Sequence, residues 1–108
     1  MIRYKCCLCP EDAADIHEIF FGSSGRKLSK KYNLMVPLCR DHHEYSHNIN
    51  KTGGAVAGRK QEAQKSFCQV MNINFYDVNM FINNSKRFKF ELEQLGIHLS
   101  GFLAGYLR

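Results

Sequence analysis

The first third of the chain alternates apolar and polar residues in a way that predicts short strands. Residues 1–5 predict a strand that leads into a cysteine-rich turn. Residues 14–21 carry β-branched and aromatic side chains on both alternating faces, which predicts a second strand. The apolar run at 34–38 predicts the return strand of a long hairpin, and Pro37 within it indicates an edge strand or a strand end.

Glycine-rich stretches and helical spacing organise the rest of the chain. Residues 22–25 (GSSG) predict a flexible loop, and the residues after it permit a short turn of helix. A helix is predicted to begin at Asp41 or a neighbour and to end near residues 48–50. Residues 51–58 (KTGGAVAG) predict a flexible segment. Apolar residues at helical spacing predict further helices over 59–71, 75–82 and 88–107.

The predicted fold class is α+β, in one compact domain. A chain of 108 residues buries roughly two thirds of its unfolded surface, so a bound metal would add considerably to its stability. Residues 1–50 hold the predicted hairpin and most of the cysteines, and residues 51–108 hold the glycine-rich segment and supporting helices. No apolar run is long enough to span a bilayer, and no signal peptide is visible.

The net charge and the cysteine content indicate the class of partner and the redox compartment of the protein. The formal net charge is +5, from 15 Lys and Arg against 10 Asp and Glu, which suits a polyanionic partner without proving one. Five cysteines without a secretory signal indicate a reducing compartment and favour thiolate ligands over disulfides. Cys68 lies alone on a helical stripe and is expected in the core. We therefore expect a cytoplasmic protein with no membrane partner.

Two ligand pairs with the spacing of a zinc site lie at the two ends of the predicted hairpin. They are Cys6-x-x-Cys9 and Cys39-x-x-His42. Each pair can present both donors to one tetrahedral ion, and closing the hairpin would bring the pairs together. The sequence therefore predicts a structural Zn²⁺ at these four residues. The alternatives are that the cysteines are small buried hydrophobic residues, or that Cys7 replaces a neighbour in the knuckle.

A pair of histidines follows this predicted zinc site. His43 and His47 are four residues apart, so on a helix both imidazoles share a face and can reach one cation. By itself the pattern is weak, and a surface pair is the alternative. The context adds weight, because this helix would face the strand that carries His17. Such an arrangement suits phosphodiester hydrolysis, in which the cation neutralises the phosphate and a histidine takes a proton from water.

These motifs together resemble the HNH endonucleases, whose fold is the ββα-metal or His-Me finger. The resemblance covers residues 5–47 and consists of C-x-x-C, an acidic-x-His strand, Asn-Leu and L-C-x-x-[C/H]-H. The segments HEIFFG, GRKLS and VPLCRDHH are most similar to small HNH proteins encoded by bacteriophages, which implies a bacterial host cell. The resemblance implies a ββα-metal finger over residues 1–50, with a zinc knuckle below it and the later helices alongside.

The resemblance also implies roles for individual residues. His17 lies in the catalytic region of the first strand, and Asn33 matches the asparagine that braces the loop carrying the catalytic histidine. His43 matches a ligand of the catalytic ion, which would be Mg²⁺, Mn²⁺ or a similar divalent ion, and His47 matches an additional ligand of some members. The structural zinc set of many members is matched by Cys6, Cys9, Cys39 and His42.

The chain departs from the family pattern at two places. Many members carry two consecutive histidines in the first strand, but here His17 is followed by Glu18. Either His17 is the base, which we favour, or His17 binds metal and Glu18 stands where the base belongs, starting from a lower basicity. In addition, residues 51–58 lack a histidine that relatives often show, which leaves His47 as the local candidate for a second ligand.

Four basic residues lie between the predicted strands: Arg26, Lys27, Lys30 and Lys31. Such a run is usually a solvated face, but beside a phosphodiester site it predicts contacts with a nucleic-acid backbone. The sequence thus predicts a metal-dependent endonuclease that hydrolyses DNA. The alternative is a catalytically weak or inactive module of the same fold that binds DNA or protein. A homodimer, or a protein partner from phage or host, stays open.

Overall fold

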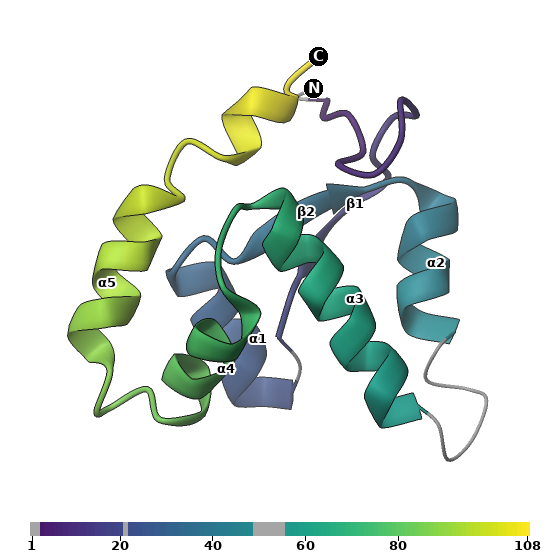
Figure 1. Ribbon diagram of the computed structural model, residues 1–108. Coiled ribbons are helices and arrows are strands. Elements are labelled where there is room, and N and C mark those ends of the chain that lie inside the picture. Colours follow the sequence, from purple (N-terminus) through teal and green to yellow (C-terminus); the bar gives the residue numbers. More distant parts are fainter. Residues whose placement is uncertain (1–2, 21, 49–55) are drawn as a thin grey trace.

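The computed structural model describes residues 3–20, 22–48 and 56–108, which form a small sheet surrounded by helices (Figure 1). The class is α+β, as predicted. The elements in chain order are β1 (Asp15–Glu18), α1 (Gly22–Lys31), β2 (Met35–Leu38), α2 (Arg40–Asn48), α3 (Val56–Val70), α4 (Phe75–Asn83), α5 (Lys89–His98) and the 3₁₀ helix η1 (Leu103–Tyr106).

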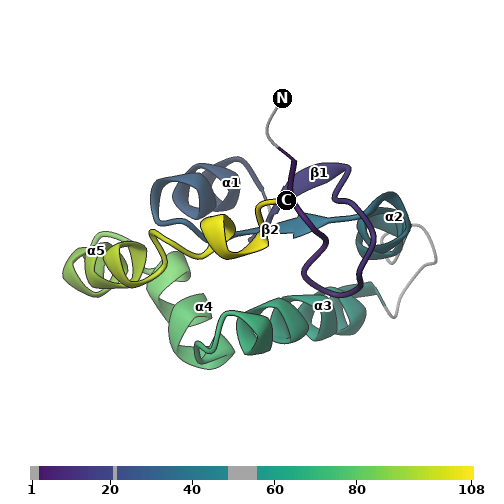
Figure 2. The same ribbon diagram turned by 90° about the horizontal axis from the view of Figure 1, so that it is seen from above.

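The sheet consists of β1 and β2, paired antiparallel with His17 opposite Val36. The predicted return strand is confirmed, and Pro37 is tolerated in it because both strands of a two-stranded sheet are edges. β1 spans only Asp15–Glu18, so it is shorter than the strand predicted at 14–21. In the view from above, α1 and α2 lie at opposite ends of the sheet and α3 runs along one side of it (Figure 2).

A helix, α1, stands where residues 22–25 predicted a flexible loop, so that prediction is wrong. Gly25 and Ser29 are buried on the inner face of α1, and Tyr32, just after the helix, is buried as well. A Cβ atom on Gly25 would lie 3.2 Å from the carbonyl carbon of Phe20, so the absence of a side chain lets α1 pack against the end of β1. The glycine therefore reflects close packing rather than a break in the chain.

Asn33 ends α1 in a left-handed conformation, with a φ of 62°. The N–H of Leu34 donates to the carbonyl of Ser29 (2.8 Å), which is the backbone bond of a Schellman cap. Asparagine adopts this conformation more readily than most side chains. Its Nδ2 also donates to the carbonyl of Gly96 (2.8 Å), so the side chain ties the end of α1 to α5.

We expect Asn33→Ala to lower the free energy of unfolding by about 2–3 kcal/mol. Alanine would be strained at this φ by ~1–2 kcal/mol and would lose a hydrogen bond worth ~1 kcal/mol. Asn33→Gly should cost less, because glycine accepts the conformation and loses mainly the bond to Gly96. Urea denaturation of both variants measures the difference. Equal losses would contradict the capping role.

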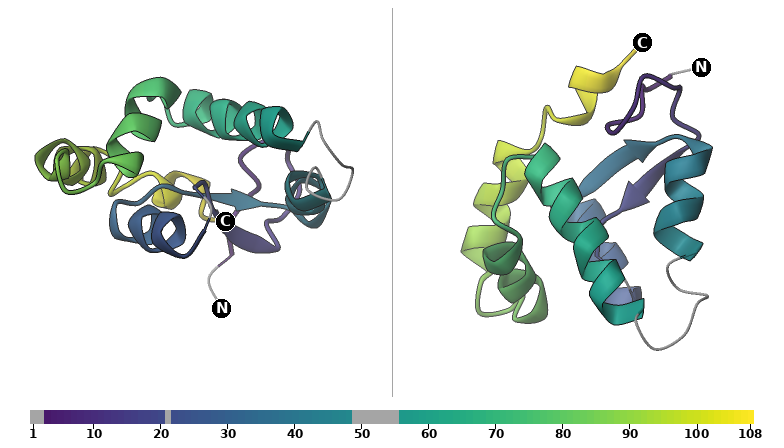
Figure 3. Two further views of the ribbon diagram at one scale, coloured as in Figure 1. Left: turned by 90° about the horizontal axis from the view of Figure 1, so that it is seen from below. Right: turned by 45° about the vertical axis from the view of Figure 1, so that its right-hand side comes forward.

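The helices α3, α4 and α5 form a layer against the sheet and beyond its end (Figure 3). Phe67 of α3 and Leu92 of α5 are buried, and Phe20 stacks on Phe75 of α4 with ring centroids 6.4 Å apart. α3 confirms the helix predicted at 59–71 but begins at Val56, inside the segment predicted to be flexible; residues 51–55 lie outside the described residues.

Two of the remaining predictions need correction. The helix predicted over 88–107 ends at His98, after which the short η1 follows. The hydroxyl of Ser100 donates to the carbonyl of Ile97 (2.9 Å) and competes there with helix continuation. Tyr4 and Lys5 form isolated bridges rather than the predicted strand, and residues 1–2 lie outside the described residues.

The bridge of Tyr4 belongs to a joint between the two ends of the described chain. The N–H of Lys5 donates to the carbonyl of Tyr106 (2.6 Å), and the N–H of Arg108 donates to the carbonyl of Arg3 (2.9 Å). The Arg108 side chain pairs with the Asp12 carboxylate at 2.6 Å. This joint fixes the segment that carries the first cysteines. In the described part of the chain, no helix is both long and apolar enough to cross a bilayer.

Candidate metal and catalytic site

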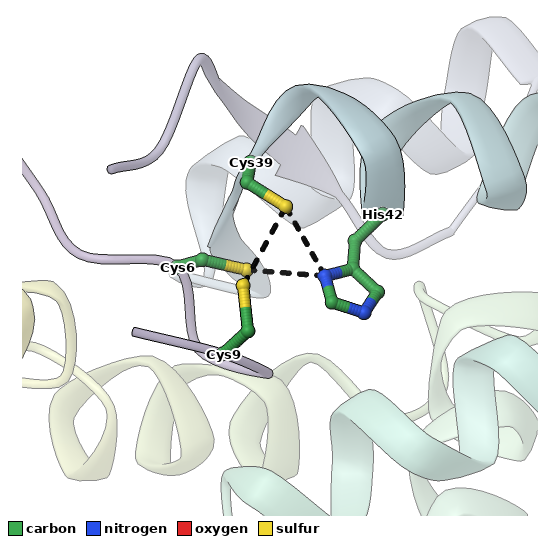
Figure 4. A group of neighbouring side chains, drawn as sticks. All are labelled: Cys6, Cys9, Cys39 and His42. Atoms are coloured by element: carbon green, nitrogen blue, oxygen red, sulfur yellow. Dashed lines mark hydrogen bonds between the residues drawn. The ribbon is translucent and has the colours of Figure 1, made fainter. Parts of the chain in front are cut away.

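Three cysteines and one histidine converge between the N-terminal segment and the start of α2 (Figure 4). The donor atoms of Cys6, Cys9, Cys39 and His42 all lie within 4.8 Å of one another. The sulfur atoms of Cys9 and Cys39 are 3.7 Å apart, and His42 Nδ1 lies 3.1 Å from Cys39 Sγ and 3.6 Å from Cys6 Sγ. The predicted grouping is therefore present in the fold.

Backbone contacts explain how residues far apart in sequence meet there. The N–H of Cys7 donates to the carbonyl of Pro37 (3.0 Å), which holds the knuckle against β2. The N–H of Leu8 points at Cys6 Sγ (3.5 Å), a bond that stabilises a thiolate. Cys39 lies at the end of β2 and His42 lies in the first turn of α2, so β2 and α2 fix the second pair.

This geometry fits a tetrahedral zinc ion. Zinc–sulfur bonds of about 2.3 Å and zinc–nitrogen bonds of about 2.0 Å imply separations of about 3.8 Å between two sulfurs and about 3.5 Å between sulfur and nitrogen in a tetrahedron. The three contacts at 3.1, 3.6 and 3.7 Å lie within a few tenths of an ångström of these values, and all the donor atoms lie within 4.8 Å of one another. The four side chains could thus bind a structural metal such as zinc. Among the described residues, no other set of three or more such donors is this close together.

The remaining two cysteines lie outside this cluster. Burial raises the pKa of Cys7 to about 12, and the charge of the neighbouring Cys6 adds to the effect. Burial raises the pKa of Cys68 to about 11. For Cys6, burial also raises the pKa, but hydrogen bonds from the backbone of Cys39 and Leu8 outweigh it, and the value falls to about 7. Cys6 is therefore suited to bind metal as a thiolate.

The pKa of Cys68 leads to a testable difference in reactivity. Because the thiolate is the nucleophile, a thiol with a pKa near 11 should react with iodoacetamide at pH 8 about a hundredfold more slowly than one with an ordinary pKa near 9. The rate should go on rising above pH 9 in the folded protein. Peptide mapping by mass spectrometry measures it, with the urea-unfolded chain as the control. Equal rates in the folded and unfolded chains would contradict the burial of this thiol.

A second cluster lies where β1 faces α2. The rings of His17 and His43 have centroids 5.4 Å apart, in an edge-to-face arrangement. Asp15 Oδ2 lies 2.9 Å from His43 Nδ1. His17 is only 4% exposed, and its ring also packs on Phe67 of α3 at 5.4 Å. Two strand residues and one helix residue therefore form a compact group that includes both His17 and His43.

Asp15 is the acidic residue of the acidic-x-His pattern, but the sequence assigned it no role of its own. Residues 15 and 17 point to the same face of a strand, so the D-x-H spacing could have indicated it. The Asp15 carboxylate can only accept a hydrogen bond, so Nδ1 of His43 carries the proton. In neutral His43 the Nε2 atom is then deprotonated, which is the form that binds a cation.

Two groups hold the end of β1 in place beside this cluster. Ser29 is completely buried, and its Oγ accepts a hydrogen bond from the N–H of Phe20 (3.1 Å). Gln64 of α3 donates from Nε2 to the carbonyl of Ile19 (3.2 Å). The resemblance assigned the bracing role to Asn33, but its side-chain bond goes to Gly96 of α5. Side-chain hydrogen bonds to the residues just after β1 come from Ser29 and Gln64.

The other predicted site residues lie elsewhere. Glu18 lies next to His17 in β1, so its side chain points to the opposite face, where its carboxylate is 3.6 Å from Lys30 Nζ. His47 belongs to α2, but its side chain lies outside the described residues. The four basic side chains all lie exposed on or at the end of α1: Arg26, Lys27, Lys30 and Lys31.

Comparisons of the chain with protein-family models, with curated proteins and with solved structures found no match. The site is therefore interpreted from its own residues and geometry.

Proposed function

We propose that the protein is a metal-dependent endonuclease that hydrolyses DNA phosphodiester bonds on a ββα-metal finger formed by β1, β2 and α2. The observation that carries the proposal is the convergence of Asp15, His17 and His43, two from β1 and one from α2. A zinc-type cluster beside it would fix the relative position of strand and helix. A carboxylate and two imidazoles are ordinary ligands and bases in hydrolytic sites.

We propose that a catalytic divalent ion would be held from α2. Nε2 of His43 would hold the ion, and the Asp15 carboxylate supports His43 from the Nδ1 side, as carboxylates do for many metal-bound histidines. When bound there, the ion would neutralise charge on the scissile phosphate and on the departing oxygen. His47, on the same helix, is proposed as a further ligand.

The chain's own residues would do the remaining work. His17 accepts a proton from the attacking water, and its contacts with Phe67 and His43 hold the ring in one orientation. Ser29 and Gln64 fix the strand that carries it. The exposed basic face of α1 neutralises DNA phosphates. Glu18 has no catalytic role in this proposal, because it pairs with Lys30 on the other face of β1.

The burial of His17 favours a second candidate function. At 4% exposure its ring is almost fully covered, which suits a structural role in a module that binds DNA or protein without cutting it. Incubating supercoiled plasmid with the wild-type protein separates the two functions. Nicking that requires Mg²⁺ or Mn²⁺ and stops with EDTA supports the nuclease. DNA binding without nicking under any divalent ion supports the module.

A further inference from the structure

A cleft of about 540 Å³ lies between β1 and the N-terminal segment. One wall is the strand and the residues just before it, and the other is the N-terminal segment. Asp15 is shared between the cleft and the proposed catalytic cluster. The cleft is lined by Arg3, Tyr4, Asp12, Ala13, Ala14, Asp15 and Ile16.

The two acidic side chains that line the cleft are paired with other residues, so Arg3 is the charged side chain that can contact a ligand. The Asp12 carboxylate is paired with Arg108 at 2.6 Å, and the Asp15 carboxylate lies 2.9 Å from His43. Arg3 is exposed and takes part in none of the ion pairs found between described residues. With both acids engaged, the cleft presents a guanidinium whose flat fork of donors matches a phosphate.

The position of Arg3 is fixed by the fold. Its carbonyl accepts the N–H of Arg108 (2.9 Å), and the next residue, Tyr4, forms the bridge to Leu107. The bridge between Lys5 and Asp12 holds the N-terminal segment against the residues that precede β1. A DNA strand that ran from the catalytic cluster past Asp15 would therefore meet the guanidinium of Arg3, a residue whose backbone is held in place by these bonds.

We infer that this cleft binds the sugar–phosphate backbone of the DNA strand being cut, and that Arg3 contacts a phosphate flanking the scissile one. The inference rests on the proposed nuclease function, since it identifies where the substrate strand runs. Arg3 is a binding residue in this assignment, and the hydrolytic step stays with His17 and His43.

The test compares Arg3→Gln with Arg87→Gln. Arg87 is also an exposed arginine, but it lies in the turn between α4 and α5, far from the N-terminal segment (Figures 1 and 3). Binding of a fluorescent DNA duplex is measured by anisotropy across a series of salt concentrations, in EDTA so that no cutting occurs. Plasmid nicking with Mn²⁺ is measured in parallel, and circular dichroism melting checks that both variants fold.

We expect Arg3→Gln to weaken DNA binding about two- to fivefold at 0.1 M salt and to reduce the slope of log K against log salt by about one. Arg87→Gln should match the wild type in both respects.

Equal behaviour of the two variants overturns the inference while leaving the nuclease proposal intact. A wild type that binds but never nicks overturns the nuclease proposal, and the same comparison still decides the role of Arg3. A wild type that binds no DNA overturns both.

Discussion

Replacing His43 with alanine should reduce plasmid nicking by about 10³-fold or more. The substitution removes the proposed ligand of the catalytic ion, and metal ions and general bases each contribute factors of this order to hydrolysis. His17→Ala should cause a loss of similar size, and because the two residues act in one step, the double variant should be little worse than either. Rates of supercoiled DNA loss with Mn²⁺ measure the effect, and DNA binding should be retained in both variants.

The control is His98→Ala, which removes an exposed histidine from the end of α5. It should nick like the wild type. Glu18→Gln is a second control, because Glu18 pairs with Lys30 and lies on the face of β1 opposite His17. A large loss in Glu18→Gln with activity retained in His17→Ala would reverse the assignment of the base.

Removing the structural metal, or replacing Cys39 with serine, should largely unfold the chain. Structural zinc contributes on the order of 10 kcal/mol in small domains, whereas a domain of this size has a total stability of about 5–15 kcal/mol. We expect one zinc per chain and a fall in melting temperature of roughly 15 °C or more in Cys39→Ser, measured by elemental analysis and circular dichroism. Acid should release the metal, because protons compete for the thiolates.

Cys7→Ser is the matched control for this experiment. Cys7 is adjacent to a ligand in sequence but lies outside the cluster, and burial keeps its thiol protonated. The variant should keep its zinc and melt within a few degrees of the wild type. If Cys39→Ser also kept its zinc and its melting temperature, the metal site would be ruled out.

The features that local chemistry determines were predictable from the sequence. The spacing of Cys6, Cys9, Cys39 and His42 identified a group that the fold does bring together. β2 and α2 were predicted within a residue or two, because a buried apolar run and a polar helix start leave few alternatives.

The features that were not predicted from the sequence depend on tertiary contacts. The residues GSSG indicated a loop because glycine and serine are poor helix formers, yet α1 begins there because Gly25 must pack on the backbone of Phe20 and Ser29 must reach its N–H. Asp15 belonged to the acidic-x-His pattern but received no role, because an acidic residue at a strand end is ordinarily solvated and its contact with His43 depends on the placement of α2.

The pairing of Tyr4 with Leu107 also has a consequence for the order of folding. A contact between residues so far apart in the sequence must close almost the whole chain as one loop, and the entropy cost of closure grows with loop length. An ion that joined Cys9 to Cys39 would already have closed part of that loop, so the remaining search would be shorter. Metal uptake would thus be an early step in folding, and the joint between the two ends of the described chain would form late.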